Sequence, residues 1–160
     1  MRIGLLGNSV DRKDVIERAV NYLNRLDLAY VVHIGNIGVP ENLDFFDGLK
    51  HRMIGVFGPL DKNRRGIAAK TLDRIKGGPL EFKSGDNNDQ LMFVYHGFEA
   101  FARSGYKEKG IDVVIHHETP EATIAIKEGL LYLNPGSLNS DNPTIVVAEL
   151  EKRNASIMHI

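Results

Sequence analysis

The chain has 160 residues, of which 42% are hydrophobic and 26% charged, with a formal net charge of -1 at pH 7; this is the composition of a globular protein. The length predicts a single domain over residues 1–160, large enough to bury a core without covalent cross-links. The absence of cysteine excludes disulfides, thiolate metal sites and cysteine nucleophiles.

The nearly balanced charge gives no general attraction to nucleic acid or to an anionic membrane. The longest apolar runs have the length of strands, so no membrane association is expected. The first residues lack the apolar length and cleavage site of a secretion signal, which favours a cytoplasmic location.

The first half of the sequence alternates short apolar runs with helical patterns. Runs at 3–6, 28–34 and 53–57 are apolar on both faces, which is typical of parallel strands covered by helices. A helix is expected over residues 15–26, with Asp11 as its N-cap, and two more are expected from Pro40 and over residues 65–75.

The second half is richer in hairpins. Three pairs of runs flank turn signals, at 80–83 and 91–95, at 122–127 and 130–133, and at 144–150 and 156–159. A short helix over residues 98–108 is expected before a buried strand at 111–115. The pattern as a whole predicts an α/β fold with two mixed sheets and helices outside.

Polar residues directly follow most of the predicted buried strands. They are Asn8, Asn36, Asp61, His96, His116, His117, Glu118 and Asn134. Because ligands of open α/β sheets bind beyond the carboxyl ends of strands, we expect these residues to gather in one pocket.

The same segments, in the same order, resemble the motifs of the calcineurin-like metallophosphoesterases. The resemblance is to the small bacterial and archaeal phosphodiesterases and to the phosphoesterase-like subunit of retromer. Where the family has Asp-x-His, Gly-Asp and Gly-Asn-x-Asp, this chain has Asn8-Ser9-Val10, Gly35-Asn36 and Gly58-Pro59-Leu60-Asp61. The family's His-Gly is kept as His96-Gly97, and its Gly-His-x-His corresponds to His116-His117-Glu118-Thr119. The family's Asn-Pro-Gly-Ser is intact at Asn134-Pro135-Gly136-Ser137. The resemblance spans essentially the whole chain and implies a four-layer α/β/β/α sandwich with two mixed sheets.

The chain departs from this family at most of its metal-ligand positions. His96 and His117 are retained, and the resemblance makes them the expected ligands of any metal, whereas Asn8 and Asn36 stand where the family has carboxylates. The remaining ligand positions hold Val10, Pro59 and Thr119. A two-metal centre brings about four positive charges, which carboxylates balance and neutral amides do not. We therefore expect no tightly bound cofactor, or otherwise a single zinc or manganese ion.

Each of these residues also has a structural interpretation. Asn8 and Asn36 are common turn residues at strand ends, and each histidine alone is more often a satisfied buried side chain than a ligand. Asp61 and Glu118 are typical of exposed loop charges, although they could compensate for the lost ligands. His116 replaces a glycine of the family, and its bulk is expected to fill part of the metal position.

Three functions remain open at this point. The leading hypothesis is a degenerate metallophosphoesterase, catalytically weak or silent, that binds a phosphate-containing small molecule or a protein partner. The competing hypothesis is a metal-dependent phosphodiesterase with a reduced site built on His96 and His117. A nucleic-acid role for Lys62, Arg64 and Arg65 is disfavoured by the near-neutral charge, and homo-oligomerisation stays open.

Overall fold

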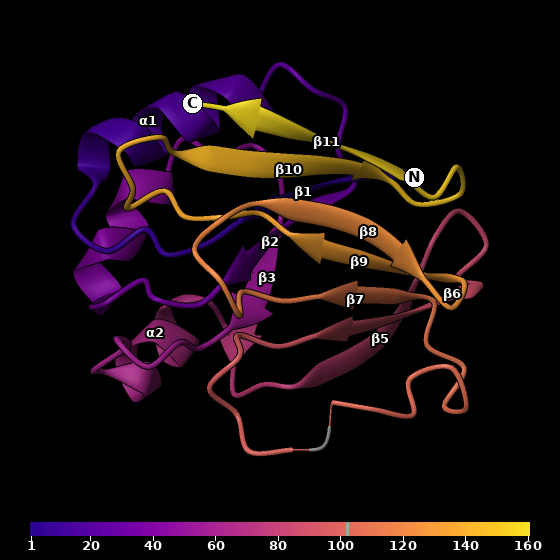
Figure 1. Cartoon of the computed structure of the whole chain (residues 1–160). Coiled ribbons are helices and arrows are strands. Elements are labelled where there is room, and N and C mark those ends of the chain that lie inside the picture. Colours follow the sequence, from indigo (N-terminus) through magenta and orange to yellow (C-terminus); the bar gives the residue numbers. More distant parts are fainter. Residues whose placement is uncertain (102) are drawn as a thin grey trace.

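The fold is built on two mixed β-sheets (Figure 1). The computed structural model describes residues 1–101 and 103–160. The six-stranded sheet contains β1 (Arg2–Leu6), β2 (Tyr30–Ile34), β3 (Met53–Val56), β4 (Ile75–Lys76), β10 (Thr144–Glu149) and β11 (Asn154–His159). The five-stranded sheet contains β5 (Leu80–Ser84), β6 (Gln90–Val94), β7 (Val113–Ile115), β8 (Thr123–Lys127) and β9 (Leu130–Asn134).

Each sheet combines parallel and antiparallel strands; the second has an antiparallel strand at both edges and the first at one edge only. The first sheet has the order β11-β10-β1-β2-β3-β4, in which β1 to β4 run parallel. The second has the order β5-β6-β7-β9-β8, in which β6, β7 and β9 run parallel. The three predicted hairpins are confirmed as the antiparallel pairs β5–β6, β8–β9 and β10–β11. The predicted mixed α/β fold with two mixed sheets is therefore confirmed.

The main core fills the space between the two sheets. Strands of both sheets contribute fully buried aliphatic side chains, among them Leu5 and Ile34 from the first sheet and Val94 and Ile115 from the second. Successive side chains of a strand point to opposite faces, so Phe93 belongs to a separate cluster on the outer face of the second sheet. This alternation also decides which polar residues beyond the strand ends face the gap between the sheets.

Helices cover the outer face of the first sheet. They are α1 (Lys13–Leu23), the 3-10 helix η1 (Pro40–Phe46) and α2 (Arg64–Lys70). The apolar stripe of α1 packs on the sheet through Val15, Ile16, Ala19, Val20 and Leu23. None of the described helices is long and apolar enough to cross a membrane.

The expected helix boundaries need three corrections. The N-cap of α1 is Arg12 and makes no side-chain cap, because Asp11 adopts a positive φ of 53° one residue earlier. The helix from Pro40 is a 3-10 helix. The helix expected over residues 65–75 ends at Lys70, and Ile75 begins β4, which pairs with β3.

The outer face of the second sheet is covered by irregular chain. A helix was expected over residues 98–108, but the described residues on both sides of position 102, which lies outside the described residues, form bends and turns. Phe101 and Tyr106 from this segment pack on Phe93, with ring centroids 5.6 and 5.3 Å away. Burial of these aromatic rings holds the segment against the sheet without helical periodicity.

The core between the sheets yields a matched test of packing. Ile115→Ala removes a fully buried side chain and should lower the free energy of unfolding by about 2–5 kcal/mol. Ile126→Ala makes the same chemical change at a side chain that is 61% exposed, and should cost less than about 1 kcal/mol. Urea unfolding followed by circular dichroism measures both, and equal losses would contradict the assignment of the core.

Candidate functional site

The carboxyl ends of the parallel strands of both sheets meet at one edge of the molecule. The first sheet contributes Asn8 after β1, Asn36 after β2 and Asp61 in the loop after β3; the second contributes His96 after β6, His117 after β7 and Asn134 at the end of β9. The amide of His117 donates to the carbonyl of His96 at 2.9 Å, and a side-chain contact links His96 to Asn36. The structure thus brings together six of the eight predicted pocket residues.

Gly35 allows the loop after β2 to lie close to Gly58 and His96. Its φ is +72°, and a Cβ at this position would lie 2.6 Å from both the amide nitrogen of Gly58 and Cδ2 of His96. The following residue, Asn36, is also left-handed, with φ of 61°. Asparagine tolerates this conformation, which supports its structural role as a turn residue.

The side chain of Asn36 bridges the two sheets. Its Oδ1 accepts from the amide of Leu60 at 3.0 Å, which fixes the orientation of the carboxamide. Its Nδ2 therefore points to Nε2 of His96, 3.2 Å away, and donates to it. The network assigns the proton of His96 to Nδ1, a buried atom without a partner among the described residues.

His117 lies beside His96 and is oriented by Asn134. The two imidazole centroids are 5.2 Å apart at an angle of 71°. Asn134 is fully buried; its Oδ1 accepts from the amide of Gly136 at 2.9 Å and its Nδ2 donates to the carbonyl of Thr119 at 2.9 Å. With the carboxamide fixed in this way, Nδ1 of His117 donates to Oδ1 over a long 3.4 Å, and Nε2 is left as the nitrogen with the lone pair.

Asn8 completes the set with an unused acceptor. Its backbone is left-handed, with φ of 48°, and its amide donates to the carbonyl of Gly35 at 3.0 Å. Its side-chain Oδ1 is buried and has no hydrogen-bond partner among the described residues. Such an atom is costly to bury unless a ligand or water satisfies it.

Asp61 is buried, so the prediction of an exposed loop charge was wrong for it. Its side chain is only 4% exposed and accepts from three backbone amides, those of Asn36, Gly38 and Gly58, at 3.1, 2.7 and 2.7 Å. The carboxylate therefore ties the loop after β2 to the loop after β3. With both of its oxygens engaged by the backbone, it is poorly placed to replace a lost metal ligand.

His116 and Glu118 lie away from the pocket. Strand alternation turns His116 to the outer face of the second sheet, where it stacks on Tyr95 with centroids 5.8 Å apart at 18°. Glu118 is 37% exposed and pairs with Arg103 at 2.6 Å, in agreement with an exposed loop charge. The expectation that His116 fills the metal position is therefore wrong, because its neighbour His117 takes the inward place.

A buried pair near the site was missed by the sequence analysis. Ser9 and His33 are both fully buried, and Oγ of Ser9 lies 2.8 Å from Nε2 of His33. The only signal in the sequence is a histidine inside the apolar run 31–34. Burial lowers the pKa of His33 to about 4, more than the nearby Asp61 carboxylate raises it.

The imidazoles of the site are neutral at pH 7. Burial lowers the pKa of His96 to about 4, and it also lowers the pKa of His117. The two rings and the two amides therefore carry no charge. Two carboxylates contact this cluster: Asp61, and Glu99, whose oxygens accept from the backbone amides of His96 and Gly97 at 2.8 and 2.7 Å. The chemistry of the site is that of neutral hydrogen-bond donors and acceptors.

A two-metal centre does not fit this set of side chains. The side-chain Oδ1 of Asn36 and Nε2 of His96 would both have to face an ion. Instead, Oδ1 accepts from the amide of Leu60, and Nε2 accepts from Nδ2 of Asn36. No group of three or more histidine, aspartate or glutamate side chains is arranged to hold a metal within the described parts of the chain.

The fold and the strand-end motifs define the class as metallophosphoesterase-like. The sequence matches the calcineurin-like phosphoesterase superfamily domain over residues 1–153, and the chain belongs to this superfamily. It is 25% identical over 158 residues to the phosphodiesterase MJ0936 of Methanocaldococcus jannaschii, covering 96% of this chain and 95% of that protein.

Solved structures agree with this assignment. An archaeal phosphodiesterase structure superposes with a TM-score of 0.87 at 23% identity, with both chains covered completely. Zinc-bound Vps29 of Entamoeba histolytica superposes with a TM-score of 0.69 at 16% identity, covering 100% of this chain and 98% of Vps29. At these identities the two structures establish the shared fold.

The three hydrogen bonds of Asp61 predict a large effect on stability. Asp61→Asn places an NH2 group against backbone donors, so we expect the free energy of unfolding to fall by about 2–4 kcal/mol. Asp27→Asn, at an exposed position, is the control and should change it by less than about 0.5 kcal/mol. Denaturant titration measures both variants, and an unchanged Asp61→Asn protein would contradict the proposed role of the carboxylate.

The lowered pKa of His33 predicts an acid-side loss of stability. The unfolded chain takes up a proton near the ordinary pKa of 6.5, whereas the folded chain does so only near 4. Stability is therefore retained above about pH 6.5 and is lost as the pH falls toward 4; this one group costs about 2 kcal/mol by pH 5. His33→Gln removes the titration, and the drop in unfolding free energy between pH 7 and pH 5 should be smaller by that amount. Equal drops in the two proteins would refute the prediction.

Proposed function

We propose that this chain is a degenerate member of the calcineurin-like phosphoesterase superfamily, catalytically weak or silent, that uses the inherited site as a binding module. The observation that carries the proposal is the contact between Asn36 and His96. It pairs an amide, at a position where the resemblance calls for a carboxylate, with the nitrogen that would have to face a metal. We also propose that residues 1–160 act as one cytoplasmic domain; the family match over residues 1–153 supports the single domain.

Charge balance supports this proposal. Two divalent ions need anionic ligands to compensate for their mutual repulsion, and the side chains of Asn8, Asn36, His96 and His117 are all neutral at pH 7. The two carboxylates at the site are both engaged by the backbone: Asp61 accepts from three backbone amides and Glu99 from two. Without two ions there is neither a strongly activated water nor a charge clamp for a phosphodiester.

A permanent cation beside the site supports a phosphate-containing small molecule as the ligand. The guanidinium of Arg64 lies 5.3 Å from the ring centroid of Phe98, and that ring packs against His96 at 5.7 Å. Arg64 also donates to the carbonyl of Gly58 at 3.3 Å. Arginine recognises phosphate oxygens without a metal, so the neutral site has an anion contact at its side. The shared fold of Vps29 supports a protein partner as the other ligand type.

Metal analysis together with a restored variant tests the proposal. Purified protein incubated with manganese should retain far less than one ion per chain and should hydrolyse bis(p-nitrophenyl) phosphate no faster than the buffer. The double variant Asn8→Asp, Asn36→Asp returns the two carboxylates and should raise manganese occupancy at least tenfold, because anionic ligands bind this hard cation. The matched control Asn21→Asp, Asn154→Asp adds the same charge at exposed positions and should not raise it.

Stoichiometric metal in the unaltered protein, with turnover that is lost in His96→Ala or His117→Ala, would overturn the proposal. Circular dichroism and thermal unfolding of these variants separate loss of the site from loss of the fold.

The second candidate is a metal-dependent phosphodiesterase with a reduced site built on His96 and His117. It is favoured by the relative named as a phosphodiesterase, which matches nearly the whole chain. It is also favoured by the adjacent imidazoles and by the buried, unpartnered Oδ1 of Asn8. One zinc or manganese ion could be held there if Asn36 released Nε2 of His96.

Anomalous scattering from crystals soaked in zinc or manganese tests this second candidate. A single peak between His96 and His117, with the Asn36 carboxamide rotated away, would support it. A pocket without a peak at millimolar metal would contradict it, since a site used for catalysis should fill under those conditions.

A further inference from the structure

Positive charge is concentrated in one part of this nearly neutral chain. Residues 50–76 contain eight of the 20 lysines and arginines but only two of the 21 aspartates and glutamates. This stretch forms β3, α2 and β4 at one edge of the first sheet. The excess of positive charge is therefore local, and the rest of the chain is acidic.

Part of this charge lines a cavity of about 390 Å³ at the start of β3. Its basic side chains are Lys50, His51, Arg52, Lys70 and Arg74, against one acidic side chain, Asp47. Its apolar wall is formed by Leu43, Phe46, Leu49 and Met53. The volume is in the range of small-molecule sites, and the combination of an apolar wall with several cations suits an organic anion.

Two arginines stand between this cavity and a neighbouring one. Arg52 and Arg74 line both the first cavity and a second one of about 240 Å³. No ion pair involves either of them in the described parts of the chain, whereas Lys70 pairs with Asp44. The Nε atom of Arg74 is buried and has no hydrogen-bond partner among the described residues. Both guanidinium groups thus have donors to spare.

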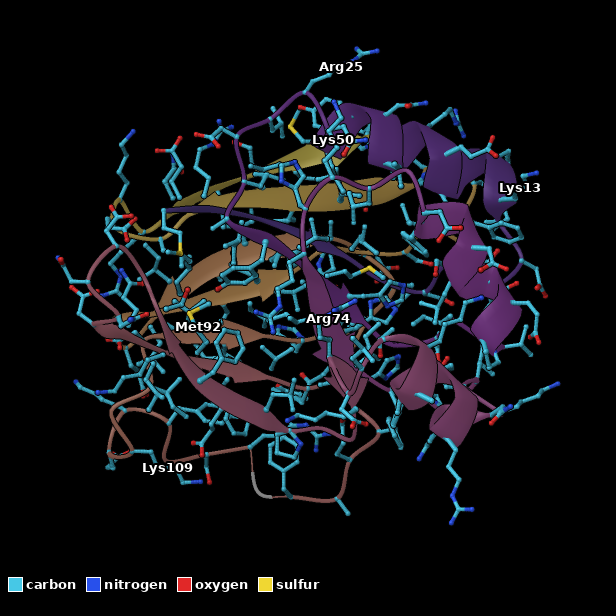
Figure 2. All side chains as sticks on the ribbon, turned by 180° about the vertical axis from the view of Figure 1, so that it is seen from behind. Lys13, Arg25, Lys50, Arg74, Met92 and Lys109 are labelled. Carbon is cyan, nitrogen blue, oxygen red and sulfur yellow. The ribbon has the colours of Figure 1, made fainter. Side chains whose placement is uncertain are left out.

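The cavity is separate from the candidate functional site. The site follows the carboxyl end of β3, whereas Arg52 precedes its first residue and Arg74 precedes the first residue of β4. The four residues of β3 separate these ends by about 13 Å. Lys50 and Arg74 line the same cavity, and Figure 2 shows Lys109 at the lower edge of the molecule, away from both.

We propose that this cavity is a binding site for a small organic phosphate. Arg52 and Arg74 would hold the phosphate oxygens through their planar forks of N–H donors, with Lys50 adding charge at the rim. The organic part would lie against Leu49 and Met53. A cavity of this size with an apolar wall suits a compact molecule better than the extended backbone of a nucleic acid, which calls for a continuous basic track.

Titration of ADP into the full-length protein, followed by backbone amide NMR shifts in 50 mM salt, tests the proposal. We expect saturable shifts confined to residues around 49–53 and 70–75, weakening as salt is raised because the contact is ionic. Arg52→Ala and Arg74→Ala should each weaken binding at least tenfold. Lys109→Ala removes one positive charge at an exposed position outside the cavity and should leave the affinity unchanged.

Several results would overturn the proposal. These are no saturable shifts, equal affinity in the arginine variants, shifts centred on His96 and His117, or tighter binding of a single-stranded oligonucleotide than of ADP. Inorganic pyrophosphate binding as tightly as ADP would overturn the role of the apolar wall. Arg52 is exposed, so Arg52→Ala should keep its fold and provides the decisive comparison if Arg74→Ala unfolds.

Discussion

One amide–imidazole contact joins the two sheets at the edge where their parallel strands end. Asn36 belongs to the loop after β2 and His96 to the loop after β6, and 3.2 Å separates Nδ2 of the first from Nε2 of the second. In a metal centre the same two side chains would be linked through a cation. In this structure the side-chain N–H of Asn36 donates to His96, so a neutral hydrogen bond joins the two loops.

Hydrogen bonds from side chains to the backbone give the site its shape. Asp61 gathers the amides of Asn36, Gly38 and Gly58, and so fixes the loops that follow β2 and β3. Asn134 does the same in the second sheet by linking Gly136 and Thr119. Asp61 only accepts, from backbone amides, whereas Asn134 accepts from the amide of Gly136 and donates to the carbonyl of Thr119. In both cases a side chain fixes the loops that shape the site.

Much of the fold could be predicted from the sequence because buried strands leave a recognisable pattern of apolar residues. The runs that become β1, β2 and β3 are apolar on both faces, and the three hairpins are marked by turn residues between short runs. The segment over residues 98–108 was less predictable. Its aromatic residues serve a tertiary cluster around Phe93, and that contact does not require a helix.

The site was predicted as a set of residues but not as an arrangement. The side chains alternate along β7 and the residues that follow it, so Ile115 and His117 point inward and His116 points outward. This alternation can be read from the sequence, but a comparison of motifs does not take it into account. The burial of Asp61 and the pairing of Ser9 with His33 depend on how loops of different strands meet. Such contacts between loops have no period in the sequence, so they emerge only from the fold.

The residues near the two ends of β3 differ in charge and in exposure to solvent. At the carboxyl end, buried imidazoles and amides are neutral, because a charge there would be separated from water without a counter-ion. At the amino end, Arg52 and Lys50 are exposed to solvent and can remain ionised without a partner. An anion therefore meets exposed cations at the amino end of β3, and at the carboxyl end it meets the guanidinium of Arg64 beside the neutral site. Recognition of a phosphate at the strand-end site would depend on Arg64 together with shape and hydrogen bonding, and recognition at the proposed cavity would depend on several charges.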